Sequence, residues 1–135
     1  MMEKQLVLIS HGRFCEELKK STEMIMGPQS EIQTVPLLPE EGADDFRQKL
    51  AAVIADSQNP VVFADLLGGT PCNAASRLIM EGATFELYAG MNMPMVIGFL
   101  NRTLTGDPLD YEQFGKENIQ HVNTLLTAVA DFEED

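Results

Sequence analysis

The sequence predicts an α/β fold in which a doubly wound, mostly parallel sheet is flanked by helices. Four apolar segments have the character of strands: residues 5–10, 32–37, 60–65 and 84–89. The first and third are almost continuous in Val, Ile, Leu, Phe and Ala, which is the pattern of inner parallel strands covered on both faces. Segments with helical spacing separate the strands, so strand and helix alternate along the chain.

The helices are predicted from apolar residues that recur every three or four positions. The first begins near Phe14 and stops at Gly27 and Pro28, the second covers residues 46–54, and the third begins at Pro71. After the fourth strand, the segment GMNMPMVIGFLNRTLTGD has a proline at a plausible helix start and a Gly-Asp-Pro stop. These features predict a further helix there.

The end of the chain allows two interpretations. Ile119, Val122, Leu126 and Val129 recur at helical spacing. The segment IQHVN within the same stretch has the composition of a short edge strand. Periodicity alone leaves both alternatives open.

Length, charge and cysteine content limit the class of protein. The 135 residues are expected to form one domain, 1–135, without a linker or repeat. The formal charge of -12 opposes binding to nucleic acid and is compatible with a basic protein partner. No signal peptide or apolar run of about 18 residues is present, and the two cysteines form no C-x-x-C motif. The expected location is therefore the cytoplasm, with no metal site and no cofactor.

The strand ends indicate where a site would lie. In an open parallel sheet, ligands bind beyond the carboxyl ends of the strands, where the strand order reverses. For the order 2-1-3-4, which is flavodoxin-like, that point lies between the loops SHGRF and DLLGGTPCN. The sequence therefore sends His11 and Asp65 to one crevice from two separate places.

These residues suit phosphoryl chemistry. A neutral imidazole is a nucleophile toward phosphorus near neutral pH, so His11 is the candidate nucleophile. Asp65 would accept a hydrogen bond from one ring nitrogen and leave the other nitrogen with its lone pair exposed. Thr70 would be the N-cap of the following helix, with Pro71 at its first position. The remaining candidates for the phosphate pocket lie near the same sheet edge: Ser10, Gly12, Arg13, Gly68, Gly69, Met91 and Asn92.

Two other functions are compatible with the same residues. In a small-ligand binding or sensory domain, His11 would only line the pocket. A cysteine-dependent enzyme would use Cys15 or Cys72, but the sequence has no resolving cysteine and no C-x₅-R loop. Buried packing is the simpler interpretation of both cysteines, and His121 is expected to be a surface residue.

The sequence resembles the enzyme IIA domains of the mannose class in the bacterial sugar phosphotransferase system (PTS). The resemblance covers essentially the whole chain and rests on LISHGRF, VVFADLLGGTPCNAA, YAGMNMPM and GKENIQHVNTLL in this order. It implies a phosphotransferase in which His11 takes a phosphoryl group from phospho-HPr through Nε2 and passes it to an enzyme IIB component. The resemblance also implies that Asp65 orients the histidine and that Thr70 donates a hydrogen bond to the phosphate or the ring. Enzyme IIB then phosphorylates a sugar during uptake through the membrane subunits IIC and IID, so contact with the membrane is indirect.

The resemblance also implies a homodimer in which a C-terminal strand crosses to the other subunit. This favours the edge strand over the helix for IQHVN. Because no IIB-type segment follows within the 135 residues, the IIB partner is expected on a separate chain.

Overall fold

A parallel sheet of four strands forms the centre of the molecule. The structure is a computed structural model that describes residues 4–134, with side chains described for residues 4–130. The strand order is β2-β1-β3-β4, as predicted. The strands are β1 (Gln5–His11), β2 (Gln33–Leu37), β3 (Pro60–Ala64) and β4 (Glu86–Ala89).

Because β1 lies between β2 and β3, Ile9 is in register with Val35 on one side and with Ala64 on the other. The order reverses between β1 and β3, so the loops that follow these two strands leave the sheet side by side.

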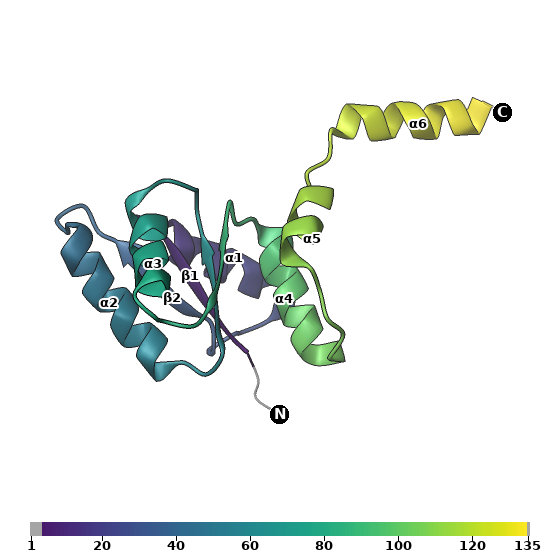
Figure 1. The fold of residues 1–135 in the computed structure, drawn as a ribbon. Coiled ribbons are helices and arrows are strands. Elements are labelled where there is room, and N and C mark those ends of the chain that lie inside the picture. Colours follow the sequence, from purple (N-terminus) through teal and green to yellow (C-terminus); the bar gives the residue numbers. More distant parts are fainter. Residues whose placement is uncertain (1–3, 135) are drawn as a thin grey trace.

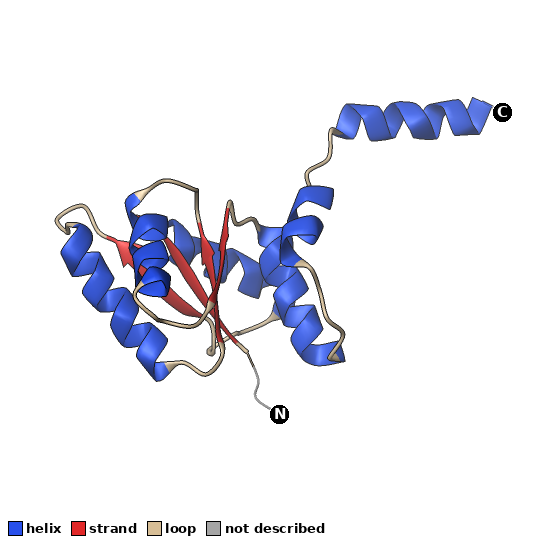
Figure 2. Ribbon diagram, in the orientation of Figure 1, coloured by secondary structure: helices blue, strands red, loops and turns tan. Residues whose placement is uncertain are grey.

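Helices cover both faces of the sheet (Figures 1 and 2). Helices α2 and α3 lie against one face, and α1 and α4 lie against the other. The helices are α1 (Phe14–Met26), α2 (Ala43–Asp56), α3 (Thr70–Met80), α4 (Met93–Thr105), α5 (Tyr111–Glu117) and α6 (Val122–Glu134). Gly106 ends α4 in a left-handed conformation with φ 79°, which confirms the predicted stop.

The core divides into two layers because side chains on a strand point alternately to opposite faces. Leu6 and Leu8 of β1 pack with α1 and α4, whereas Val7 and Ile9 pack with α2 and α3. All five residues of β3 are buried. The continuous apolar runs in the sequence therefore reflect burial on both sides of the sheet.

Aromatic packing fixes α5 to the body of the molecule. The ring of Tyr111 at the start of α5 lies 5.6 Å from that of Phe63 and 5.5 Å from that of Tyr88, both in edge-to-face orientation. Tyr111 is almost fully buried.

The segment after α5 corrects one expectation. Residues 119–121 form no strand, and α6 begins at Val122, so the expected edge strand in IQHVN is not formed. The physical reason is that residues from Val122 onward have apolar side chains at helical spacing, and a single chain offers no partner sheet with which an exchanged strand would pair. The described side chains of residues 116–130 are all exposed. Helix α6 stands away from the body (Figure 1).

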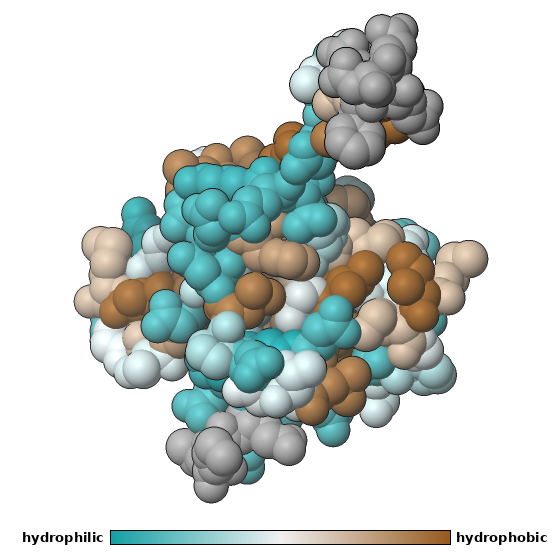
Figure 3. Space-filling model, turned by 90° about the vertical axis from the view of Figure 1, so that its right-hand side faces the viewer, coloured by the Kyte–Doolittle hydropathy of each residue, from teal (hydrophilic) through white to brown (hydrophobic). Residues whose placement is uncertain are grey.

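The surface that carries α4 and α5 is mixed in character. Figure 3 shows separate apolar patches between hydrophilic side chains on this face. No helix within residues 4–134 is both long enough and apolar enough to span a bilayer.

Candidate functional site

His11 is the last residue of β1, and its side chain is 45% exposed. The chain turns immediately after it because Gly12 adopts a positive φ of 57°, which glycine tolerates without steric cost. The Gly12 N–H donates to the Leu37 carbonyl at 2.7 Å, so this turn is fixed to the end of β2. The histidine therefore stands at the sheet edge on a backbone held by the neighbouring strand.

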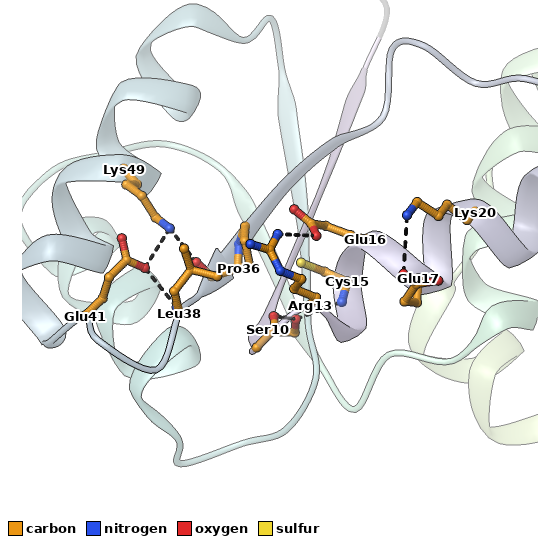
Figure 4. Close-up of polar contacts among 11 residues, drawn as sticks. Ser10, Arg13, Cys15, Glu16, Glu17, Lys20, Pro36, Leu38, Glu41 and Lys49 are labelled. Carbon is orange, nitrogen blue, oxygen red and sulfur yellow. Dashed lines mark hydrogen bonds and ion pairs between the residues drawn. The ribbon is translucent and has the colours of Figure 1, made fainter.

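Ser10 stabilises the same turn from the inside. Its buried hydroxyl donates to the Gly12 carbonyl at 2.9 Å and accepts the Cys15 N–H at 2.8 Å (Figure 4 labels Ser10 and Cys15). The hydroxyl thereby caps the first turn of α1, for which the N-cap residue Arg13 provides no side-chain acceptor. Ser10 was expected to line the phosphate pocket, but its hydroxyl points into the protein.

Asp65 is hydrogen-bonded to the His11 ring. Oδ2 of Asp65 lies 2.8 Å from Nδ1 of His11 and accepts the His11 backbone N–H at 2.9 Å. Oδ1 accepts the Leu66 N–H at 2.9 Å, so both carboxylate oxygens are engaged. Because an ionised carboxylate only accepts hydrogen bonds, it places the imidazole proton on Nδ1 and the lone pair on Nε2.

The other side of the ring lies against Gly69. A Cβ atom at this glycine would stand 2.4 Å from Cε1 and 3.0 Å from Nε2 of His11. Gly69 is the N-cap of α3, so Nε2 lies beside the positive end of that helix. Within residues 4–134, the hydroxyl of the next residue, Thr70, has no hydrogen-bond partner and is thus available to a ligand.

The side chains of three other candidates for the phosphate pocket have partners within the protein. Arg13 forms an ion pair of 2.8 Å with Glu16, which together with the charge of Glu16 raises the Arg13 pKa (Figure 4). The Met91 side chain is buried in the core. Asn92 accepts the Met95 N–H through Oδ1 and thereby caps α4. The structure uses these side chains for surface pairing, packing and capping.

The cysteines and the second histidine are not part of this arrangement. Cys15 and Cys72 are buried in opposite layers of the core, as expected for packing residues. Burial raises the pKa of the Cys15 thiol, which disfavours the reactive thiolate. His121 is exposed in the segment between α5 and α6, where its Nδ1 lies 2.6 Å from the Thr124 hydroxyl. The geometry gives no support to a cysteine-dependent enzyme.

The surface around His11 has features that sequence inspection missed. Leu66 is 50% exposed and Leu67 is 79% exposed, directly after Asp65. Two adjacent leucines in a loop between an aspartate and a glycine pair were the available signal, because a turn normally contains polar residues.

A cavity of about 390 Å³ lies elsewhere, between β4 and α5, and is lined by Tyr88, Asn92 and Lys116 among others. No group of three or more His, Cys, Asp or Glu side chains in the described part of the chain is arranged to hold a metal ion.

The fold and the site first define a class: an open parallel α/β protein that presents a carboxylate-oriented histidine where the strand order reverses. Residues 5–107 match the family described as the PTS system fructose IIA component (EIIA-man), and the chain belongs to this family. It is a IIA component of the mannose class of the phosphotransferase system, as the resemblance in sequence indicated.

Individual relatives agree with this assignment. The chain is 36% identical over 95 residues to the mannose-specific EIIAB component of Escherichia coli K12, which covers 68% of this chain and 29% of that protein. The chain thus matches less than a third of that relative's length. The fructose-specific EIIA component of Bacillus subtilis is 32% identical over 99 residues, covering 71% of this chain and 68% of the relative.

A solved structure shows the same fold. The mannose/sorbose specific IIA subunit from Enterococcus faecalis superposes with a TM-score of 0.75 at 31% identity, covering 89% of this chain and 95% of the other.

Proposed function

We propose that this protein is a phosphocarrier in which His11 accepts a phosphoryl group from phospho-HPr and passes it to an enzyme IIB component. Enzyme IIB would then phosphorylate a sugar during its uptake. The observation that carries the proposal is the hydrogen bond of 2.8 Å between Nδ1 of His11 and Asp65, on a ring that remains 45% exposed. This contact leaves the lone pair on Nε2, and the exposed ring can be reached by a second protein.

In the proposed transfer, a bond to phosphorus forms on one histidine while a bond to phosphorus breaks on the other. The Nε2 lone pair of His11 forms a bond to phosphorus while the bond from phosphorus to the donor's imidazole nitrogen breaks, and that nitrogen keeps the electron pair. During the attack the His11 ring gains positive charge, and its Nδ1 proton stays in the hydrogen bond to Asp65. The carboxylate therefore stabilises the charge that develops on the ring.

The first turn of α3 supports the phosphoryl group. Its N-terminus carries partial positive charge beside Nε2, and the Thr70 hydroxyl is a suitable donor to a phosphate oxygen. A site that supports the group with dipoles and single hydrogen bonds positions it without binding it strongly. This suits a carrier, which must release the group to its acceptor.

Labelling with phosphoenolpyruvate, enzyme I and HPr tests the proposal. One acid-labile phosphoryl group per chain is expected, and His11→Ala should abolish it. The second histidine of the chain offers a matched control, since His121→Ala should be labelled like the unmodified protein. Labelling that persists in His11→Ala would contradict the proposed role of His11.

We also propose that the protein forms a homodimer through α6. The side chains of Val122, Leu125, Leu126 and Val129 lie on one side of this helix and are exposed. An apolar side that is exposed in the described part of the chain is stabilised when a second copy covers it.

Sedimentation tests the proposed dimer. Leu126→Glu places a charge within the apolar side of α6 and should shift the protein toward the monomer, whereas Thr127→Glu on the neighbouring surface should leave the dimer intact. An unchanged dimer in Leu126→Glu would argue against α6 as the contact.

A further inference from the structure

We propose that Leu66 and Leu67, called the leucine pair below, form the contact on which the phosphohistidine-carrying donor protein docks. This inference rests on the proposed function and adds to it the surface that recognises the donor. The pair lies in the loop between β3 and α3, directly after the aspartate that holds His11. One side chain is half exposed, and the other is 79% exposed.

The loop holds the leucine pair outward. The Asp65 N–H donates to the Ile9 carbonyl at 3.2 Å, and Oδ1 of Asp65 accepts the Leu66 N–H at 2.9 Å. On the other side of the pair, the Asn73 amide donates to the Gly68 carbonyl at 3.3 Å. These contacts fix the backbone of the loop, on which both leucine side chains are exposed. The apolar side chains therefore stay in water until a partner covers them.

The segment after β1 adds a third exposed apolar side chain. Phe14 is the first residue of α1 and is half exposed. His11 ends β1 three residues before Phe14, so exposed apolar side chains follow both strands, β1 and β3, whose ends meet at the histidine. A partner that brings phosphorus to Nε2 must approach these loops.

The charges nearby define the chemistry of that partner. Glu16 and Glu17 occupy the first turn of α1, and the Arg13 guanidinium is paired with Glu16. The whole chain carries a formal charge of -12. A complementary partner has an apolar centre beside its phosphohistidine and lysine or arginine side chains around it.

Matched substitutions test the leucine pair. Leu67 and Leu104 are both 79% exposed, but Leu104 lies near the end of α4. Initial rates of transfer from phospho-HPr are measured over a range of donor concentrations for Leu67→Ser and Leu104→Ser. Loss of a central apolar contact should raise the KM of Leu67→Ser about tenfold or more. Its kcat should stay within about twofold of the unmodified protein, because the substitution leaves the contacts of His11 in place. The Leu104→Ser variant should match the unmodified protein in both constants.

The outcomes separate this inference from the proposed function. At saturating donor, Leu67→Ser should still take up one phosphoryl group per chain, with an unchanged melting temperature. An unchanged KM in Leu67→Ser and in the double variant Leu66→Ser/Leu67→Ser would overturn the docking role. A fall in kcat at constant KM would also overturn it, because that result assigns the loop to positioning. Absence of labelling in the unmodified protein would instead overturn the proposed function.

Discussion

The contact between Gly69 and the His11 ring permits a sharp test of how the histidine is positioned. An alanine methyl at residue 69 would stand 2.4 Å from Cε1 of the ring, whereas carbon atoms pack at about 3.5–4.0 Å. The ring must therefore move by roughly 1 Å or more. A shift of that size would stretch the Nδ1–Asp65 distance of 2.8 Å beyond hydrogen-bonding range if the ring moves away from the carboxylate.

The expected result for Gly69→Ala is a fall in phosphoryl-transfer rate of about 100-fold, the typical cost of a displacement of about 1 Å at a reacting group. Folding should be little affected. Gly69 has φ -91° and ψ 170°, an extended conformation that alanine adopts without strain. Loss of backbone freedom in the unfolded chain and the weaker N-cap preference of alanine act in opposite directions, each by about 1 kcal/mol or less.

Gly42→Ala is the matched control. Gly42 is the N-cap of α2, with φ -101° and ψ -175°, and a methyl group there would meet only an Asp45 carboxylate oxygen at 3.9 Å. Rates of transfer from phospho-HPr and urea unfolding midpoints are compared for the two variants. Both should show similar stability, and only Gly69→Ala should transfer slowly. A normal rate in Gly69→Ala would refute the inference that this glycine sets the position of the ring.

Three further substitutions test the contacts around the site. Asp65→Ala should slow transfer more than it lowers the melting temperature, because its carboxylate orients the histidine; equal losses would make it a structural residue. Ser10→Ala leaves the buried Cys15 N–H without its acceptor and should lower the free energy of unfolding by about 1–3 kcal/mol in urea titrations, with recovery in Ser10→Thr; no change would contradict the capping role. The hydrogen bond from Lys49 holds the pKa of Glu41 below its usual value, so this pair stabilises the fold above the unfolded carboxyl pKa and loses its effect as pH falls through the lowered value. The difference in urea midpoint between the unmodified protein and Lys49→Met should therefore shrink in acid, and a constant difference would contradict this pairing.

The continuous apolar runs were sufficient to predict the four parallel strands. The apolar residues that recur every three or four positions between these runs were sufficient to predict the helices. The runs were sufficient because a strand buried on both faces leaves a strong local pattern. The rule that ligands bind where strand order reverses brought His11 and Asp65 together, and the structure places them 2.8 Å apart.

The directions and partners of individual side chains were less predictable. Sequence inspection placed Ser10 in the phosphate pocket, yet its hydroxyl points inward to cap α1. Arg13 pairs with Glu16, and Met91 packs in the core. The direction of a side chain at a turn depends on backbone angles and on neighbouring elements, which residue type and spacing leave undetermined.

The end of the chain illustrates the same limit. The helical spacing of Val122, Leu126 and Val129 agrees with α6, whereas the resemblance favoured an edge strand. A strand needs hydrogen-bond partners from another segment, but a helix satisfies its own backbone. The outcome therefore depended on the partners available to this segment.

The sequence by itself determined the order of elements, the family and the meeting of His11 with Asp65, because these follow from local patterns and from chain order. The tertiary structure left the leucine pair exposed to water. It also decided which atoms meet, namely the methylene of Gly69 with the imidazole and the Asp65 carboxylate with Nδ1. Such contacts join residues more than 50 positions apart in the chain. Packing forces of short range act between them only after the sheet has brought its strand ends together.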